Sequence, residues 1–324
     1  MNIEHLISSY HNFEANLYAN ESRSGLLAPV EYIMSLKSKR IRPLLTLIGF
    51  SLYNDKVQSC LHAAHGLELF HNFTLMHDDI MDQAELRRGK LATHLRYGIN
   101  EAIISGDAMS IMSYEYIMKD CPDDQLRTIL QLFNKTAIDI CIGQQMDMEF
   151  EKIDVVNSED YLEMVRLKTA IFLGLALQIG SLIAGSTFKE SELLFKYGES
   201  IGLTFQIQDD LLDLYGNQND IGKINGGDIL RNKKTILVCK ANELCNSDQK
   251  ESLRQLLNEN DISSEKKIEE ALTIFQSINL QDVIESEIEK YFSLAKAQLN
   301  ELALNKDQLN LLENIAQMIQ ARKS

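Results

Sequence analysis

Only three prolines, Pro29, Pro43 and Pro122, interrupt the 324 residues of this chain. Proline is the strongest breaker of a helix interior, so long helices are permitted almost everywhere. Over residues 1–20 apolar side chains recur at steps of three and four, and no part of the chain sustains the alternating pattern of a strand. The sequence therefore predicts an all-α fold. We expect a single domain over residues 1–324, built from roughly ten or more helices around a central cavity.

Several helix boundaries follow from capping residues and apolar runs. Pro43 suits the first turn of a helix, and a long apolar helix is expected from Val57 to Met81. Ser158 is followed by two acidic residues, so we expect it to cap a helix that continues to Ala184. The segment after Gly89 is expected to be a loop that leads into the next helix.

Charge and cysteine content limit the possible partners. A net charge of −15 argues against nucleic acid as the main partner, because backbone-phosphate binding needs a broad basic surface. The five cysteines are odd in number and form no CxxC pair, which favours a reducing, cytoplasmic compartment. The most apolar run, from Ile171 to Gly185, is shorter than the roughly 20 residues that cross a bilayer. It predicts a buried core helix, and no membrane span is expected.

Two acidic clusters with the same spacing end two apolar helical runs, 131 residues apart. They are Asp78, Asp79 and Asp82 in HNFTLMHDDIMDQAELRRG, and Asp209, Asp210 and Asp213 in FQIQDDLLDLYG. On a helix the outer two carboxylates of each cluster lie one turn apart on the same face. Grouped carboxylates raise each other's pKa unless a cation neutralises them, and oxygen-only ligands suit Mg²⁺. One such cluster can be a solvated helix end, but two copies favour magnesium binding.

Basic residues accompany both clusters. Arg87 and Arg88 begin five residues after Asp82, and guanidinium groups suit paired binding of phosphate oxygens. Further basic candidates are Lys39, Arg40 and Arg42 in KSKRIRP, Lys168 at the head of an apolar helix, and Lys223 and Lys233 on either side of a glycine-rich turn. Each of these sets taken alone also fits ordinary solvated charges, so the acidic clusters carry the argument.

Three rival interpretations remain open at this point. His77 next to Asp78, with His62 and His65 upstream, suggests an HD-type metal phosphohydrolase. That interpretation leaves the second acidic cluster and the Arg-Arg-Gly sequence unexplained. A terpene cyclase shares a helical fold and an acidic cluster, but it needs no second diphosphate site. A non-catalytic helical scaffold has no need for both acidic clusters together with their basic neighbours.

The motifs, in order, resemble those of the trans-polyprenyl diphosphate synthases over about residues 36–240. They are KR.RP, H......DDIMD....RRG, GD, GQ..D, KT, FQ..DD..D and GK...GD....K.T. The members of this family are all-α enzymes that extend allylic diphosphates with isopentenyl diphosphate. The resemblance implies an isoprenoid-synthase-like fold, prenyltransferase activity, a homodimer, and three Mg²⁺ ions held by the six aspartates. The implied allylic substrates are dimethylallyl, geranyl and farnesyl diphosphates.

The resemblance also implies a role for each remaining candidate. Lys39, Arg42, His71 and Arg88 would bind the diphosphate of isopentenyl diphosphate, and Arg87, Lys168, Lys223 and Lys233 would bind the allylic diphosphate. Lys168, Thr169 and Gln206 form the implied catalytic set, in which Thr169 and Gln206 face the developing allylic cation. Gln144 and Asp147 would be supporting polar residues. Lys37 and Ser38 stand where the family usually has two glycines.

Product length is expected to depend on the helix that leads into the first acidic cluster, because a tethered chain extends along it. Phe73, five residues before Asp78, is large enough to block that path, whereas Thr74, one turn before, is small. This pattern resembles the geranylgeranyl (C20) synthases, and aromatic residues at both positions would suggest farnesyl (C15). The sequence predicts a C20 product, with C15 as the alternative. Phe73 can also simply pack between helices.

Overall fold

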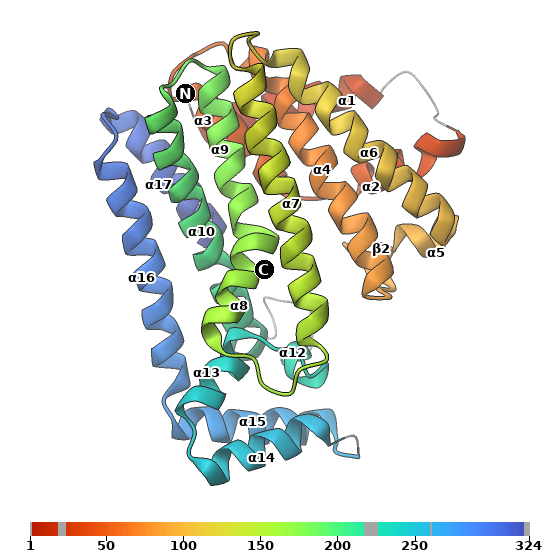
Figure 1. The fold of residues 1–324 in the computed structure, drawn as a ribbon, viewed down its shortest axis with the longest axis vertical. Coiled ribbons are helices and arrows are strands. Elements are labelled where there is room, and N and C mark those ends of the chain that lie inside the picture. The colour runs from red at the N-terminus through yellow and green to blue at the C-terminus, as the bar shows by residue number, and fades with distance from the viewer. Residues whose placement is uncertain (1, 19–23, 217–225, 260, 321–324) are drawn as a thin grey trace. The chain divides into compact units, whose positions relative to one another are not determined.

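The computed structural model describes residues 2–18, 24–216, 226–259 and 261–320. Helices make up nearly all of this part of the chain (Figure 1), which confirms the predicted all-α class. The chain divides into two compact units. Unit 1 comprises residues 1–133, 175–194 and 304–311, and unit 2 comprises residues 134–174, 195–303 and 312–324. The expectation of a single domain over the whole chain stays a prediction.

Unit 1 contains the N-terminal helices and the hairpin that follows the first acidic cluster. Its elements are α1 (Ile3–Tyr18), η1 (Gly25–Leu27), α2 (Ala28–Ser35), α3 (Ile41–Ser51), η2 (Val57–Cys60), α4 (Leu61–Met81), β1 (Leu86–Arg87), β2 (Lys90–Leu91), α5 (Thr93–Tyr97), α6 (Ile99–Asp120) and the start of α7 (Leu126–Phe150). Pro43 lies in the first turn of α3, as predicted. Helices α4 and α6 pack side by side along their lengths (Figure 1).

Two glycines allow α3 to pack closely against the second half of α9 (Ile171–Ile183) within unit 1. A Cβ atom at Gly49 would lie 2.2 Å from the carbonyl oxygen of Leu177, and one at Gly180 would lie 1.9 Å from that of Thr46. Both contacts are too short for any side chain, so glycine is required at both positions. This packing fixes α3, which carries Arg42.

Unit 2 contains the elements around the second acidic cluster and most of the C-terminal helices. They are the rest of α7, α8 (Ser158–Val165), the π-helix η3 (Arg166–Ala170), the start of α9, most of α10 (Phe188–Tyr215), α12 (Gly227–Leu230), α13 (Ile236–Leu244), α14 (Ser247–Asn258), α15 (Ser264–Ser277), α16 (Leu280–Asn300) and the end of α17 (Lys306–Gln320). A buried apolar cluster from α8, α10 and α13–α16 forms the core of this unit.

Two sequence-based expectations were wrong in detail. The cap of α8 is Asn157, whose side chain accepts a hydrogen bond from the backbone N–H of Asp160 at 2.8 Å, and Ser158 is the first helical residue. Asparagine caps a helix as well as serine does, and the serine one residue later obscured it. After Gly89 the chain forms a second strand, β2, that pairs with β1, and not a loop.

One stretch, Ser158–Ile183, is long and apolar enough to cross a bilayer by length and composition, but 83% of its most apolar window is buried inside the protein. Core helices of globular proteins commonly pass this test, and the burial confirms the prediction of a core helix around Ile171. All five cysteines are free thiols.

Candidate diphosphate and metal site

The first acidic cluster lies at the C-terminal end of α4, which ends at Met81, with Asp82 as its C-cap. Asp79 is fully buried, and its Oδ1 atom accepts hydrogen bonds from Nε of Arg87 at 2.8 Å and from Nη2 of the same side chain. The Nη2 atom also lies 3.6 Å from Oδ2 of Asp78. Burial raises the pKa of Asp79, and the hydrogen bonds and charge of Arg87 oppose that rise. Arg87, which is predicted to bind phosphate, therefore contacts two acids of the first cluster in this structure.

A two-residue hairpin places Arg87 against these acids. Leu86 pairs with Leu91 and Arg87 pairs with Lys90 across the two strands. The two residues between the strands, Arg88 (φ 53°) and Gly89 (φ 74°), both have positive φ. Positive φ at both central residues is the pattern of the type I′ turn, and this turn favours glycine at its second central position. The glycine of the Arg-Arg-Gly sequence is thus explained by backbone conformation, because no atom lies within 4 Å of its absent Cβ.

Arg42 and His71 form a second basic group in unit 1. Nη1 of Arg42, on α3, donates a hydrogen bond to Nε2 of His71, on α4, at 3.1 Å. Burial lowers the pKa of His71 well below its ordinary value, and the charges of Arg42, Arg88 and Arg87 lower it further. Burial also lowers the pKa of Arg42 to about 10. His71 is therefore a neutral acceptor that orients Arg42, two turns before Asp78 on the same helix.

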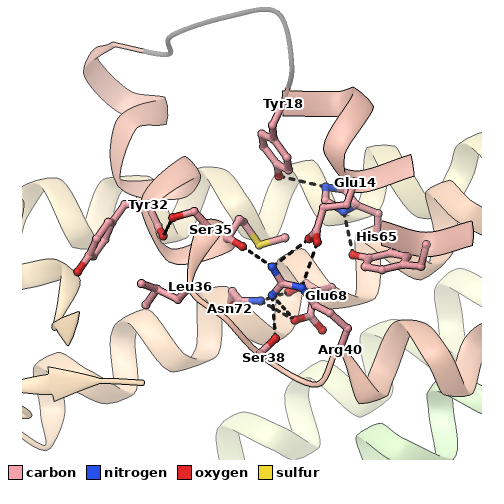
Figure 2. Close-up of polar contacts among 12 residues, drawn as sticks. Glu14, Tyr18, Tyr32, Ser35, Leu36, Ser38, Arg40, His65, Glu68 and Asn72 are labelled. Atoms are coloured by element: carbon pink, nitrogen blue, oxygen red, sulfur yellow. Dashed lines mark hydrogen bonds and ion pairs between the residues drawn. The ribbon is translucent and has the colours of Figure 1, made fainter. Parts of the chain in front are cut away.

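Arg40 is a basic candidate by its position between Lys39 and Arg42, but the structure shows its side chain bonded within the protein. Its Nη1 donates to Glu68 at 2.9 Å and to Ser38 at 3.1 Å, Nε donates to Glu14 at 3.3 Å, and Nη2 donates to the backbone carbonyl of Met34. Figure 2 shows these contacts converging on one guanidinium group. Arg40 thus uses its donors within the protein.

This cluster fixes the start of α3. Arg40 is the N-cap of α3 and has a left-handed backbone conformation with φ 48°, which is unfavourable for an arginine unless its side chain is held. Its neighbours on either side are Lys39, which is exposed, and Ile41, which precedes Arg42. We conclude that Arg40 positions Lys39 and Arg42. The basic spacing in the sequence could not separate this buried arginine from its exposed neighbour.

The residues proposed to limit product length lie on α4 before the acids. The ring of Phe73 packs edge-on against His77, with ring centroids 4.8 Å apart, and lies 5.4 Å from the ring of Phe70. The hydroxyl group of Thr74 donates to the carbonyl oxygen of His71 at 2.8 Å. Both side chains are partly exposed. Their effect on product length stays a prediction.

The histidines of the HD-type alternative are held apart in separate structural contacts. Nδ1 of His62 lies 2.9 Å from Asp120, and the two ring nitrogens of His65 contact the hydroxyl groups of Tyr10 and Tyr18. Nε2 of His77 lies 3.1 Å from the backbone carbonyl of Ile103 on α6. They do not converge with Asp78 on one point, which argues against the phosphohydrolase.

The second acidic cluster lies on the last turns of α10 in unit 2. Asp210 is buried, and its Oδ2 atom accepts hydrogen bonds from the hydroxyl of Tyr161 at 2.5 Å and from the backbone N–H of Ile236 at 3.2 Å. Gln206 donates to its Oδ1 atom at 3.2 Å. Burial raises the pKa of Asp210 to about 6, although these three hydrogen bonds lower it. Nothing in the sequence pointed to Tyr161.

Asp213 continues this cluster into the next element. Its Oδ2 atom accepts a hydrogen bond from the backbone N–H of Asp228 at 2.9 Å, and its carbonyl oxygen accepts one from Gly226. These contacts fasten the start of α12 to the end of α10. Of the two lysines predicted around the glycine-rich turn, Lys223 lies outside the described residues, and Lys233 is exposed next to α12. The charge of Lys233 lowers the pKa of Asp210.

Lys168 and Thr169 lie in the π-helix η3 (Arg166–Ala170). Nζ of Lys168 donates a hydrogen bond to Oδ2 of Asp147 on α7 at 2.6 Å. Asp147, predicted as a supporting polar residue, thus contacts Lys168, which is predicted to bind the allylic diphosphate. A Cβ atom at Gly143 would lie 2.4 Å from the backbone nitrogen of Lys168, so α7 packs directly against the π-helix. Single π-turns of this kind occur frequently at functional sites.

The acidic clusters suit magnesium by the chemistry of their donors. No group of three or more His, Cys, Asp or Glu side chains in the described residues is arranged to hold a metal ion. In each cluster the middle carboxylate, Asp79 or Asp210, is buried and bonds to protein donors, whereas the two outer aspartates are at least partly exposed. Magnesium typically takes one or two carboxylates, with water and substrate phosphates completing its shell. The outer pairs, Asp78 with Asp82 and Asp209 with Asp213, therefore fit Mg²⁺.

Comparison with known proteins gives consistent results along the chain. The family profile described as polyprenyl synthetase matches residues 23–275. A short chain isoprenyl diphosphate synthase from Methanocaldococcus jannaschii is 37% identical over 90% of this chain and 88% of its own length. A crystal structure of a geranylgeranyl pyrophosphate synthase is 37% identical, with a TM-score of 0.92 over 100% of both chains. A polyprenyl synthase from Caulobacter crescentus CB15, complexed with calcium and isoprenyl diphosphate, is 25% identical, with a TM-score of 0.84 over 99% of this chain and 96% of that one.

Proposed function

The chain belongs to the polyprenyl synthetase family, and we propose that it condenses isopentenyl diphosphate with an allylic diphosphate to give geranylgeranyl diphosphate. The observation that carries this proposal is in unit 1. There a basic hairpin bonds to the acidic end of α4, and Arg42 on α3 bonds to His71, which lies on the same α4 helix. Adjacent carboxylates and guanidinium groups suit a diphosphate whose charge is shared between metal and protein. The relatives named above supply the reaction class.

We assign the two diphosphates to different residues. Lys39, Arg42 and Arg88, with His71 as the neutral partner of Arg42, bind isopentenyl diphosphate. Arg87, Lys168, Lys223 and Lys233 bind the allylic diphosphate. Arg40 takes no part in binding because its donors are already used, and it acts by positioning its neighbours. Because His71 is neutral, the positive charge that this pair offers to the diphosphate lies on Arg42.

Magnesium is the metal we propose, held by Asp78, Asp82, Asp209 and Asp213, with Asp79 and Asp210 as their positioning neighbours. The related Caulobacter crescentus structure, which holds calcium with isoprenyl diphosphate, supports a divalent cation. When bound, the metal neutralises charge on the departing diphosphate. The number of ions implied by the resemblance is three, and that number is part of the proposal. Arg87 already bonds to Asp79. Its remaining N–H groups bind the same diphosphate as the metal.

The reaction needs no protein nucleophile. The allylic diphosphate leaves as its growing negative charge is stabilised by Lys168, Lys233 and Arg87. Thr169 and Gln206 present their side-chain oxygens to the resulting allylic cation, and the alkene of isopentenyl diphosphate attacks it. A proton is then lost, for which the departed diphosphate is the base we propose. Apolar helices exclude water, which would otherwise capture the cation.

We assign the C20 length to Phe73. Its ring is held between Phe70 and His77, so it is a rigid block on α4 and not a mobile side chain. Thr74 is small and its hydroxyl bonds to its own helix, which leaves room beside the ring. A C15 product is the alternative. Phe73→Ala is expected to lengthen the products by one or more five-carbon units, and an unchanged product length would contradict this role.

The test of the reaction is direct. The protein is incubated with Mg²⁺, isopentenyl diphosphate and, in separate tubes, dimethylallyl, geranyl or farnesyl diphosphate, and the lipids are extracted and separated by chain length. We expect a C20 product from each primer. A cyclic hydrocarbon would indicate a terpene cyclase, release of phosphate alone a phosphohydrolase, and no turnover a scaffold.

A homodimer is also part of the proposal. Ile104, Ile111 and Met118 are 56%, 70% and 42% exposed and recur every seven residues, so they form one apolar stripe along α6. An apolar stripe of this kind suits burial against a second copy. The mass in solution tests it, with Ile111→Glu expected to shift the protein towards monomer. A single domain, a cytoplasmic location and the lack of a nucleic-acid partner complete the proposal.

A further inference from the structure

A cavity of about 610 Å³ in unit 1 is lined by four basic residues that have a feature in common: none forms an ion pair with a carboxylate of the described residues. They are Lys37, Arg88, Lys90 and Arg96. The cavity lies among α2, the Leu36–Lys37 turn, the hairpin and α5, and Glu31 is the one acid among its described lining residues. Only Arg88 belongs to the substrate-binding residues assigned above.

The gathering of four basic residues around one cavity stands out in a chain that has 47 acidic residues against 32 basic ones. Lys37, Lys90 and Arg96 are all exposed. The recorded hydrogen bond of Arg88 goes to the backbone carbonyl of Leu36, at 3.3 Å, and not to an acid. Unpaired cations gathered around one cavity create a positive potential that attracts anions.

Arg96 is held in place by aromatic rings. Its guanidinium carbon lies 4.2 Å from the ring centroid of Tyr32 and 5.4 Å from that of Tyr97, and the two rings lie 5.7 Å apart. The hydroxyl of Tyr32 donates to the carbonyl oxygen of Leu91 on β2 at 2.7 Å, which fixes this ring. Stacking occupies the face of a guanidinium group but leaves its N–H edges for an anion.

The Arg40 cluster lies next to this cavity, and a neighbouring pocket lined by Arg40 and Glu14 shares Leu36 and Lys37 with it. In Figure 2 the labelled side chains of Tyr32 and Leu36 lie on one side of the turn after α2, and the residues around Arg40 lie on the other. On the Arg40 side the positive charge is balanced by Glu14 and Glu68. On the cavity side no such carboxylates are present among the described ion pairs. The charge of Arg40 is therefore balanced within the protein, whereas the basic residues of the cavity form no ion pair with a carboxylate of the described residues.

We propose that this cavity is a peripheral binding site for a diphosphate group, formed by Lys37, Lys90 and Arg96 and bordered by Arg88. Its role rests on the proposed function: a diphosphate held here lies beside Arg88, a residue of the isopentenyl diphosphate site. The recognised chemistry is the diphosphate itself, with its several negative oxygens. It can come from isopentenyl diphosphate on its way to the reaction or from the inorganic diphosphate released by it.

The chain contains no tryptophan, which allows a site-specific reporter. Tyr97→Trp places a single indole in the wall of the cavity and preserves an aromatic face near Arg96. The metal-free Tyr97→Trp protein is titrated with inorganic diphosphate, and separately with isopentenyl diphosphate, while tryptophan fluorescence is recorded at constant ionic strength. We expect a saturable change with both ligands. A change with only one of them identifies the source of the diphosphate.

The same titration in the Lys37→Gln/Lys90→Gln background is expected to need about tenfold more diphosphate, because two cationic contacts are lost. The matched control is Lys56→Gln/Lys135→Gln, which removes the same charge from two exposed lysines outside the cavity and is expected to leave the titration unchanged. No saturable signal, or equal midpoints in the two double variants, overturns the peripheral site.

The proposed function is tested separately. Product formation by the unmodified protein does not depend on the reporter, so absent prenyl transfer with an intact fluorescence response contradicts the enzyme assignment alone. Normal prenyl transfer with no fluorescence response contradicts the peripheral site alone. Raising the salt concentration is expected to weaken the fluorescence response. Salt screens the attraction between exposed charges, with a Debye length of about 10 Å at 0.1 M ionic strength.

Discussion

The two acidic clusters share one sequence spacing but differ in how the protein treats the middle aspartate. In unit 1, Asp79 is fully buried and bonded to the charged guanidinium of Arg87. In unit 2, Asp210 is buried as deeply, but its partners are neutral: a tyrosine hydroxyl, a backbone N–H and a glutamine amide. One carboxylate is hydrogen-bonded to a charged group, and the other to neutral donors.

This difference shows that a repeated motif need not be a repeated site. Asp79 connects its cluster to a basic hairpin, so the first cluster has a guanidinium group bonded to it. Asp210 connects its cluster to α8 and α13, so the second cluster is anchored to the core of unit 2. Burial is the largest cause of the pKa shift in both places: it lowers the pKa of His71 near the first cluster, where nearby arginines lower it further, and it raises the pKa of Asp210 in the second.

The largest expected effect tests what the clusters have in common. Asp78→Ala and Asp209→Ala each delete an outer carboxylate, which is partly exposed and contributes little to core packing. We expect turnover to fall on the order of 10³-fold or more in both, because charge on the leaving diphosphate is no longer neutralised. Steady-state kinetics at saturating Mg²⁺ measure this, with circular dichroism as the check of folding.

Near-normal turnover in either variant would contradict metal binding by that cluster. A large loss in only one of them would mean that the second copy of the spacing is structural. The control is Asp123→Ala, because Asp123 is an exposed acid on a loop.

The middle aspartates test what the clusters do not share. Asp79→Asn leaves Arg87 with a neutral partner. Since about a quarter of the Arg87 side chain is exposed, we expect the free energy of unfolding to fall by about 1–2 kcal/mol. Asp210→Asn keeps an oxygen for Tyr161 and removes a buried charge, so its expected loss is under about 1 kcal/mol. Urea unfolding at pH 7.5 measures both. An equal or larger loss for Asp210→Asn would contradict the comparison.

The hairpin arginines give a smaller and more selective effect. Arg87→Ala is expected to raise the KM for the allylic substrate by about tenfold, and Arg88→Ala that for isopentenyl diphosphate, because each loses one charged contact to a phosphate. Initial rates with one substrate varied and the other saturating separate the two constants. Equal shifts of both constants in both variants would count against the division. Arg254→Ala, at an exposed ion pair in unit 2, is the control.

Much of this fold could be predicted from the sequence, because its elements are long and few residues break them. The helix ending at Met81 and the core helix around Ile171 follow from apolar periodicity and from the positions of proline. The short hairpin was missed because two-residue strands carry no detectable alternation. Its one signal was the glycine of the Arg-Arg-Gly sequence, which here marks a turn with positive φ.

The candidate site was predictable to the level of residue types but not of partners. Spacing identified the six aspartates and the arginines near them, yet it could not show that Asp79 and Asp210 bond to protein donors. It also could not separate Arg40, which is 8% exposed, from Lys39 beside it. Such distinctions depend on contacts with residues far along the chain, such as Tyr161 and Glu14, whose positions no local pattern encodes.

The last expected effect appears only as the pH falls and concerns the electropositive setting of the first cluster. Because the pKa of His71 is lowered in the folded protein, the unfolded chain binds more protons below the unfolded pKa of about 6.5. The stability that depends on neutral His71 is therefore fully present above pH 6.5 and is lost as the pH falls. Between pH 7.5 and pH 5 we expect the wild type to lose about 1–2 kcal/mol of unfolding free energy relative to His71→Asn, which cannot titrate. Urea unfolding of both proteins across this range measures the difference. The exposed His5 supplies the control, since His5→Asn is expected to follow the wild type at every pH. If the gap between His71→Asn and the wild type is constant with pH, His71 is not held neutral, and the contrast between an arginine-rich first cluster and a hydrogen-bonded second one loses its electrostatic part.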